Sequence, residues 1–169
     1  MQLLFTIAIV FGALALFAKK PAITKPEKLQ FDDSVFEKYG GLYGINPILL
    51  RAVAYVESSW NPSATNPDDP SYGLMQILCK PDGSGGCSNH FEVDDWPPWN
   101  FSVLYDPDYN VKIGAQILKW NIDQYGFYKG IAVYNSWTAR NDPEHGPFSN
   151  QEYVDKVLGA FIGFGGLPL

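Results

Sequence analysis

The apolar residues of this chain recur mainly at the three- and four-residue spacing that is typical of helices. The segments with this spacing lie at 35–39, 49–56, 113–120, 131–134 and 154–158. No segment alternates between apolar and polar residues over more than a few positions, and no internal repeat is present. The pattern therefore predicts a mainly helical domain with very little strand.

Residues that favour helix N-termini precede several of these segments. Asn46-Pro47 and Asp106-Pro107 are each typical of an N-cap followed by a proline in the first helical turn. One of the two aspartates at 32–33 is expected to cap the first helix with its carboxylate. The last helix is predicted to begin with a capping box formed by Ser149 and Glu152.

The chain divides into several predicted regions. Residues 1–20 are predicted to be a membrane anchor, residues 21–30 a linker with lysines and prolines, residues 31–160 the folded domain, and residues 161–169 an apolar tail. The folded part is long enough for one well-buried core, because 46% of the chain is hydrophobic and 15% is aromatic.

The anchor is predicted from the apolar run at 3–18, which has no charge and is followed by lysines. It is slightly short for a spanning helix, which needs roughly 17 to 25 residues, but thinning of the bilayer tolerates the difference. A cleaved export signal is the alternative, because Ala13-Leu14-Ala15 fits the small-residue pattern of a cleavage site. The lysines favour a cytoplasmic position for the domain that follows.

The charge balance argues against nucleic acid as a partner. The formal net charge is −6 and the sequence pI is about 4.7, so the chain has no basic stripe to neutralise phosphates. The tryptophans suit stacking on sugars, although most aromatic residues in any domain fill the core. They are Trp60, Trp96, Trp99, Trp120 and Trp137.

The two cysteines enclose a glycine-containing loop. Cys79 and Cys87 are close enough in sequence for that loop to bring their sulfurs together, so a disulfide is one outcome. Two free thiols are the other outcome if the domain stays in a reducing compartment. His90 and His145 show no recognisable ligand spacing with these cysteines. No metal ion and no other cofactor is expected.

Glu57 is the residue with the clearest chemical potential. It follows the apolar positions of 49–56, at the C-terminal end of a predicted helix. Burial there is expected to raise its pKa by about two units, and the negative end of the helix dipole acts in the same direction. A carboxyl group with such a pKa keeps a proton that it can donate to a glycosidic oxygen. An ordinary surface position on an amphipathic helix is the alternative.

Three separated segments carry a resemblance to a known family. They are Glu57-Ser58-Ser59-Trp60-Asn61-Pro62 with Ala64, then Ser71-Tyr72-Gly73-Leu74-Met75-Gln76-Ile77, then Ala132-Val133-Tyr134-Asn135. In this order and spacing they resemble the soluble-type lytic transglycosylases of glycoside hydrolase family 23 type, which cut bacterial peptidoglycan. The resemblance covers about 31–158. It implies a mainly helical, lysozyme-like α+β fold with minimal strand content.

The resemblance also implies a reaction. Glu57 matches the family's catalytic carboxyl group, which protonates the oxygen between N-acetylmuramic acid and N-acetylglucosamine. The same group then takes the proton of the muramic acid C6 hydroxyl, which gives a 1,6-anhydro sugar without consuming water. The residues that match the family's substrate-binding positions are Ser71, Met75, Gln76, Tyr134, Asn135 and Tyr153. Among these, Met75 and Tyr134 are the ones most expected to serve the structure as well.

Two departures from the family pattern affect the expected subsites. The loop between Glu57 and Gly73 is about one residue longer than usual, and Ser136-Trp137 replaces a small turn that often contains glycine. Neither change touches the proposed chemistry. Both change the surroundings in which a sugar would bind.

Other functions remain open at this point. A hydrolytic muramidase would need a second carboxylate roughly 5 to 9.5 Å from the first. The candidates for it are four aspartates in predicted loops: Asp68, Asp69, Asp94 and Asp95. A catalytically silent protein that binds glycan or has a structural role at the membrane is a third possibility, because fold does not determine activity.

The expected partner is the glycan strand of peptidoglycan, and residues 1–18 are expected to contact a membrane. The favoured role is local opening of the cell wall as a phage enters the cell, with the chain as a virion component. The alternative is a cellular enzyme that opens the wall in the periplasm for a secretion or conjugation apparatus. Both roles place the domain at the cell wall.

Overall fold

The structure of the protein is a computed structural model that describes residues 29, 31–80, 82–83, 87 and 101–167. The predicted anchor at 1–20, most of the predicted linker and the tryptophan-proline segment at 96–99 lie outside the described residues. So do His90, Asp94 and Asp95. Within the described ranges, none of the helices combines the length and the apolar character that crossing a membrane requires.

The described chain is mainly helical, as the apolar pattern predicted. Its helices are α1 (Ser34–Tyr43), α2 (Pro47–Ser58), α3 (Pro107–Tyr125), α4 (Phe127–Asn135) and α5 (Gln151–Gly163), with 3₁₀ segments η1 (Phe101–Tyr105) and η2 (Trp137–Asn141). The strands β1 (Ser71–Tyr72) and β2 (Ile77–Leu78) pair antiparallel, with Ser71 opposite Leu78. The short strands frame the turn at 73–76.

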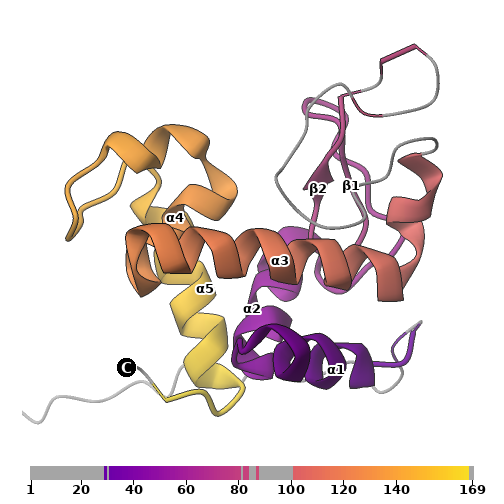
Figure 1. Cartoon of the computed structure of the whole chain (residues 1–169), viewed down its shortest axis with the longest axis horizontal. Helices are drawn as coiled ribbons and strands as arrows, with labels where there is room; N and C mark the ends of the chain where they lie inside the picture. The colour runs from indigo at the N-terminus through magenta and orange to yellow at the C-terminus, as the bar shows by residue number, and fades with distance from the viewer. Residues whose placement is uncertain (1–28, 30, 81, 84–86, 88–100, 168–169) are drawn as a thin grey trace, which may run out of the picture.

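The long helix α3 runs through the middle of the molecule (Figure 1). The two strands stand above one end of α3, and α4 lies above the other end, whereas α1 lies on the opposite side (Figure 1). Helix α5 descends past α3 to reach α2, which it contacts directly. This arrangement places the C-terminal end of α2 between the strands and α5.

The predicted starts of α2 and α3 are confirmed. Asn46 accepts a hydrogen bond from the N–H of Ile48 at 2.9 Å, and Asp106 accepts one from the N–H of Tyr109 at 2.8 Å. A proline follows each cap in the first turn, where a helix needs no N–H donor. Helix α3 ends at Tyr125, and its C-cap is Gly126, whose positive φ of 79° suits glycine.

The predicted capping box of the last helix is wrong. Helix α5 begins after Asn150, and no side chain caps its first turn. Ser149 instead donates its backbone N–H to Asp142 at 2.6 Å, while Glu152 forms an ion pair with Lys156 one turn further along. Asp142, seven residues before Ser149, therefore occupies the N–H that Glu152 would bind in a capping box.

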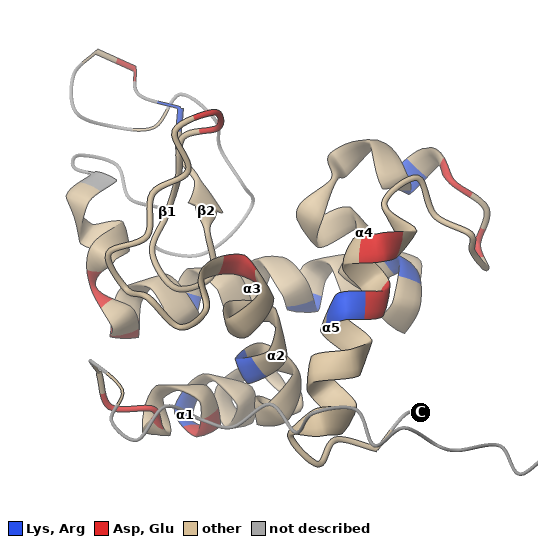
Figure 2. Cartoon of the chain, turned by 180° about the vertical axis from the view of Figure 1, so that it is seen from behind, with Lys and Arg blue, Asp and Glu red and all other residues tan. Residues whose placement is uncertain are grey.

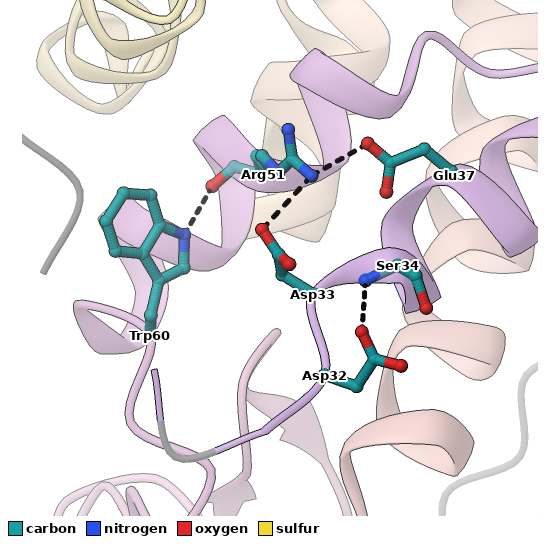
Figure 3. A network of polar contacts seen from close by, with 6 residues as sticks. All are labelled: Asp32, Asp33, Ser34, Glu37, Arg51 and Trp60. Carbon is teal, nitrogen blue, oxygen red and sulfur yellow. Dashed lines mark hydrogen bonds and ion pairs between the residues drawn. The ribbon is translucent and has the colours of Figure 1, made fainter. Parts of the chain in front are cut away.

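The start of α1 is tied to α2 (Figure 3). Asp32 accepts a hydrogen bond from the N–H of Ser34, the first residue of α1, at 3.0 Å, whereas the side chain of the N-cap residue Asp33 makes no capping hydrogen bond. Asp33 instead contacts Arg51 of α2 at 3.3 Å, and Glu37 contacts the same guanidinium at 2.7 Å. Asp32 therefore bonds to the start of α1, and Asp33 pairs with α2.

The same arginine also fixes the chain that leaves α2. The indole N–H of Trp60 donates to the backbone oxygen of Arg51 at 3.0 Å (Figure 3). Ser59 and Trp60 both have positive φ angles, of 54° and 62°, so the chain reverses sharply after the helix. Trp60 is held in this turn by ring contacts with Tyr55 and Phe164, at centroid distances of 5.0 and 5.2 Å.

One core joins the helices and the strands. Leu50 of α2, Ile113 of α3, Ile131 of α4 and Phe161 of α5 are all buried within it. Helix α5 continues to Gly163, so the first residues of the predicted tail belong to this helix. Lys and Arg residues occur on α1, α2, α3, α4, η2 and α5 and are not gathered on one element of the described chain (Figure 2).

The disulfide was one of the two outcomes expected for the cysteines. The structure shows a bond between Cys79 and Cys87, whose Cα atoms are 5.0 Å apart. Cys79 is fully buried directly after β2. The bond therefore connects Cys87 to the core beside the strands.

Candidate active site

A cavity of about 1010 Å³ opens between the strand side and the α4 side of the molecule. One wall is formed by the loop and strands of 64–80, and the other by the C-terminal half of α3 with α4 and η2. Glu57, in the last turn of α2 as predicted, lies on this cavity. These elements are the ones that lie on either side of the α2 end in Figure 1.

Glu57 is partly buried and receives one strong hydrogen bond. The hydroxyl of Tyr153 on α5 donates to Oε1 of Glu57 at 2.6 Å. Burial raises the pKa of Glu57 from 4.5 to about 7, and the hydrogen bond from Tyr153 acts in the opposite direction. The carboxyl group is therefore divided between its protonated and ionised forms near neutral pH, which suits a group that both gives and takes a proton.

Two buried tyrosines, Tyr153 and Tyr134, interact electrostatically with this carboxyl group. Burial raises the pKa of Tyr153 well above its usual value, and the negative charge of Glu57 acts in the same direction. The pKa of Tyr134 is raised for the same two reasons. Both hydroxyls therefore remain protonated, and Tyr134 donates to the backbone oxygen of Met75 at 2.9 Å.

The turn between β1 and β2 forms part of the cavity wall. Gly73 has a φ of 77°, and a Cβ at this position would collide with the backbone oxygen of Leu104. Gln76 also has a positive φ, of 47°, and its side chain donates to the backbone oxygens of Gly73 at 2.9 Å and Ala64 at 3.3 Å. Gln76 thus faces the cavity while it braces the turn from within.

Asn110 supports this turn from below, and the sequence reasoning did not predict that role. Its side chain is fully buried, and it accepts from the N–H of Met75 at 2.7 Å. It also donates to the backbone oxygens of Tyr72 and Leu104, both at 2.8 Å. Its position, seven residues before the buried Ile117, was the available indication, because it puts a polar side chain on the apolar face of α3.

Ser58 is a second supporting residue that was not predicted. Its hydroxyl lies 3.0 Å from the backbone oxygen of Ala54 and 2.7 Å from that of Leu74. The second contact connects the end of α2 to the turn. Because Ser58 is the neighbour of Glu57, this contact fixes the helix end that carries the carboxyl group.

Met75 lies elsewhere than its predicted substrate-binding role requires. Its side chain is fully buried, and Gly114 of α3 provides the space for it, since a Cβ at that glycine would collide with the methionine. The side chain therefore belongs to the core and does not reach the cavity. Met75 contributes to the site through its backbone, which binds Asn110 and Tyr134.

The remaining predicted site residues converge near Glu57. Ser71 and Asn135 line the large cavity together with Gln76 and Tyr134. Asn135 is held by Asn150, whose side chain donates to Asn135 Oδ1 at 3.0 Å. The sequence analysis did not single out Asn150. The structure thus brings together side chains from α2, β1, α4 and α5 that are far apart in the chain.

A second, smaller cavity of about 420 Å³ also borders Glu57. It is bordered by Glu57, Asn135, Asn150 and Tyr153, among others. Glu57 therefore borders both cavities, so the surroundings of its carboxyl group include the space of each.

A second acidic side chain also reaches the large cavity. Asp69 lies on its wall, whereas Asp68 is not among the lining residues. In the part of the chain that the structure describes, no three His, Cys, Asp or Glu side chains are grouped closely enough to hold a metal ion.

Comparison with known proteins agrees with the resemblance carried by the three motifs. The family described as Transglycosylase SLT domain matches residues 34–152, which is more than half of the chain. A membrane-bound lytic murein transglycosylase F of Haemophilus influenzae is 34% identical over 90 residues, or 53% of this chain. A transglycosylase of Enterobacteria phage PRD1 is 30% identical over 105 residues, or 58% of this chain.

Solved structures show the same fold. The 70-kDa soluble lytic transglycosylase of Escherichia coli aligns with 79% of this chain, with a TM-score of 0.61 and 25% identity. The matches cover only part of these longer proteins: 15% of the Haemophilus protein, 34% of the phage protein and 24% of the Escherichia coli protein. On the extent of the family match, this chain belongs to the Transglycosylase SLT domain family.

Proposed function

We propose that this protein is a peptidoglycan lytic transglycosylase. It cleaves the β-1,4 bond between N-acetylmuramic acid and N-acetylglucosamine and forms a 1,6-anhydro-muramic acid end. The observation that carries the proposal is the place of the Glu57 carboxyl group, which borders both cavities and accepts a hydrogen bond from Tyr153; burial raises its pKa to about 7, which leaves it a proton to donate. The names of the relatives, which are lytic murein transglycosylases, support the same substrate.

In the first step, Glu57 acts as a general acid. Its carboxyl proton passes to the glycosidic oxygen as the bond between that oxygen and C1 of the muramic acid breaks. The N-acetylglucosamine leaves with a free hydroxyl, and positive charge develops at C1 and the ring oxygen. The newly formed Glu57 carboxylate stabilises this charge, while the hydrogen bond from Tyr153 keeps the carboxylate in position.

In the second step, the same carboxylate acts as a base. It removes the proton from the C6 hydroxyl of the muramic acid, and the C6 oxygen bonds to C1. Glu57 regains its proton, and no water is consumed. A pKa near the working pH suits both steps, because the group must lose and recover a proton in each cycle.

The other cavity residues are proposed to bind the sugar. Ser71, Gln76 and Asn135 offer hydroxyl and amide groups on opposite walls of the cavity. Tyr134 donates to the backbone of the turn, so its ring is fixed where it lines the cavity. These groups match the hydroxyl and acetamido groups of N-acetylated sugars.

A hydrolytic muramidase is the second candidate, and one observation favours it. Asp69 lies on the same cavity as Glu57 and is exposed, so it has access to a water molecule in that space. A hydrolase would use this carboxylate to activate the water or to attack C1. The two reactions leave different ends on the cleaved strand.

Mass spectrometry of the released muropeptides separates these reactions. Purified peptidoglycan is digested with the full chain and, in parallel, with the Glu57→Gln and Asp69→Asn variants. We expect 1,6-anhydro ends from the wild type and from Asp69→Asn, and none from Glu57→Gln. Reducing ends that disappear in Asp69→Asn would instead establish the muramidase. No product from the folded wild type would favour a silent glycan-binding protein.

We further propose that the chain opens the wall locally as a phage enters a cell. The phage PRD1 transglycosylase among its relatives supports this role, and the membrane-bound relatives support a membrane position for residues 1–18. A secretion or conjugation apparatus in the periplasm is the cellular alternative. Detection of the chain in purified virions would support the phage role, and detection only in the host cell envelope would contradict it.

A further inference from the structure

Two tryptophans form an exposed aromatic pair on the wall of the large cavity. Trp120 comes from α3 and Trp137 from η2, and both line the cavity that contains Glu57. Their ring centroids are 6.2 Å apart at an interplanar angle of 21°, so the rings are nearly parallel and offset. Their exposed fractions are 36% and 48%.

The pair is oriented by its neighbours in the absence of a ligand. Trp120 contacts the ring of Tyr125 edge-on at 6.1 Å, and the guanidinium of Arg140 lies 4.7 Å from the ring centroid of Trp137. These contacts restrict the indoles and still leave large parts of both exposed. Because large apolar side chains in a cavity lose contact with water when a ligand covers them, a preformed pair of this kind is suited to binding.

The polar groups beside the pair indicate which ligand it suits. Asn121 is the next residue after Trp120, and Asn135 lies two residues before Trp137, and both amides line the same cavity. A pyranose ring has a face of C–H groups that packs against a flat indole, with hydroxyl and acetamido groups around its edge. Flat aromatic surface bordered by amide donors and acceptors matches this combination.

We propose that Trp120 and Trp137 form a sugar-stacking platform that holds one ring of the glycan strand apart from the ring cleaved at Glu57. The inference rests on the proposed function and adds to it the residues that make binding depend on the length of the glycan strand. A strand long enough to reach the platform binds more tightly than a short one. The platform acts on binding, so it affects KM and leaves kcat nearly unchanged.

Binding is measured first, with the full chain carrying Glu57→Gln so that no turnover occurs. The probes are peptide-free oligomers of N-acetylglucosamine of increasing length, titrated by calorimetry. Trp137→Ala is expected to weaken the binding of the longest oligomer about tenfold, or about 1.4 kcal/mol, and to have little effect on the shortest. Trp137→Tyr keeps an aromatic face and is expected to restore most of the affinity.

The control is Tyr128→Ala in α4. Tyr128 has an exposed fraction of 42%, similar to that of the tryptophans, but it is not among the residues of either cavity that borders Glu57. Its replacement is expected to leave both binding and cleavage unchanged.

Indole N–H resonances provide a second measurement in the protein with both tryptophans intact. Those of Trp120 and Trp137 should shift on titration, while that of the buried Trp60 stays in place.

The inference is overturned if Trp137→Ala binds the longest oligomer as tightly as the protein with both tryptophans does and the indole resonances do not move. Resonances that move only with peptide-bearing muropeptides would do so too, because the stem peptide and not the sugar would then be bound. The resonance measurement does not depend on the stability of any substituted protein. A wild type that cleaves peptidoglycan without this platform effect refutes the platform alone, whereas a wild type that binds oligomers and releases no product refutes the catalytic proposal alone.

Discussion

Replacement of Glu57 by glutamine is expected to stabilise the folded protein at alkaline pH, although it removes the proposed general acid. Glutamine has the same shape and retains an oxygen that can accept the hydrogen bond from Tyr153. It differs in having no ionised form. The substitution therefore isolates the free-energy cost of holding a carboxylate in this partly buried position.

The size of the effect follows from the two pKa values. The pKa of Glu57 is about 7 in the folded protein and 4.5 without the surrounding structure. Between these values the folded state binds more protons than the unfolded state, so the free energy of unfolding falls as the pH rises. Each unit of difference between the two pKa values corresponds to about 1.36 kcal/mol. At a pH above both pKa values, the ionised carboxyl group therefore lowers the free energy of unfolding by about 3 kcal/mol, and at a pH below both it has no effect.

Urea unfolding of the wild type and of Glu57→Gln at about pH 4 and about pH 9 gives the measurement, because the effects of all other titrating groups cancel in the difference. The variant should gain about 3 kcal/mol relative to the wild type between the two conditions, or about 6 to 12 °C in Tm for a chain of this size. Glu152→Gln is the matched control, since Glu152 pairs with Lys156 on the surface and its pKa is lowered. If the difference in unfolding free energy between Glu57→Gln and the wild type were the same at both pH values, burial would not raise the pKa of Glu57, and the reasoning would be refuted.

Three further outcomes are expected. Tyr153→Phe removes the hydrogen bond that lowers the pKa of Glu57, so the alkaline limit of peptidoglycan cleavage should move to higher pH; an unchanged profile would contradict this. Asn110→Ala leaves three buried backbone groups without their partner and should cost about 3 kcal/mol or more in urea unfolding; a loss below about 1 kcal/mol would show that the turn finds other partners. Replacement of Cys79 and Cys87 by serine should cost about 2 to 3 kcal/mol, with reductant lowering the Tm of the wild type and leaving that of the variant unchanged.

The sequence predicted those features that depend on local chemistry. Asn46 and Asp106 cap their helices because each side chain needs only the N–H groups of the next turn. The position of Glu57 follows from the helix that Asn46 begins. The capping box at Ser149 also has a local pattern and fails, because Asp142, seven residues earlier, accepts the hydrogen bond from the Ser149 N–H that Glu152 would need.

The sequence did not predict the features that depend on tertiary contacts. Asn110 stabilises a turn 35 residues earlier in the chain, at Met75, and nothing near Asn110 in sequence specifies that partner. Met75 itself was expected at the substrate, but an apolar side chain beside a cavity suits the cavity wall and the core equally well. The side chain of Met75 lies in the core because Gly114 leaves space for it there, and that space exists only after α3 packs beneath the turn.

The chemistry of Glu57 is itself a product of such a contact. Its hydrogen-bond donor, Tyr153, lies 96 residues later in the chain, and burial of the carboxyl group requires α5 to dock on α2. Burial alone would raise the pKa of Glu57 further, and the tyrosine limits the rise, so the value near 7 is a balance between two effects. A related sequence that kept the Glu57 motif without a donor at this position would keep the carboxyl group and work at a different pH. The pKa of Glu57, and with it the pH range expected for the proposed reaction, therefore depends on the junction of α2 and α5 as much as on the glutamate.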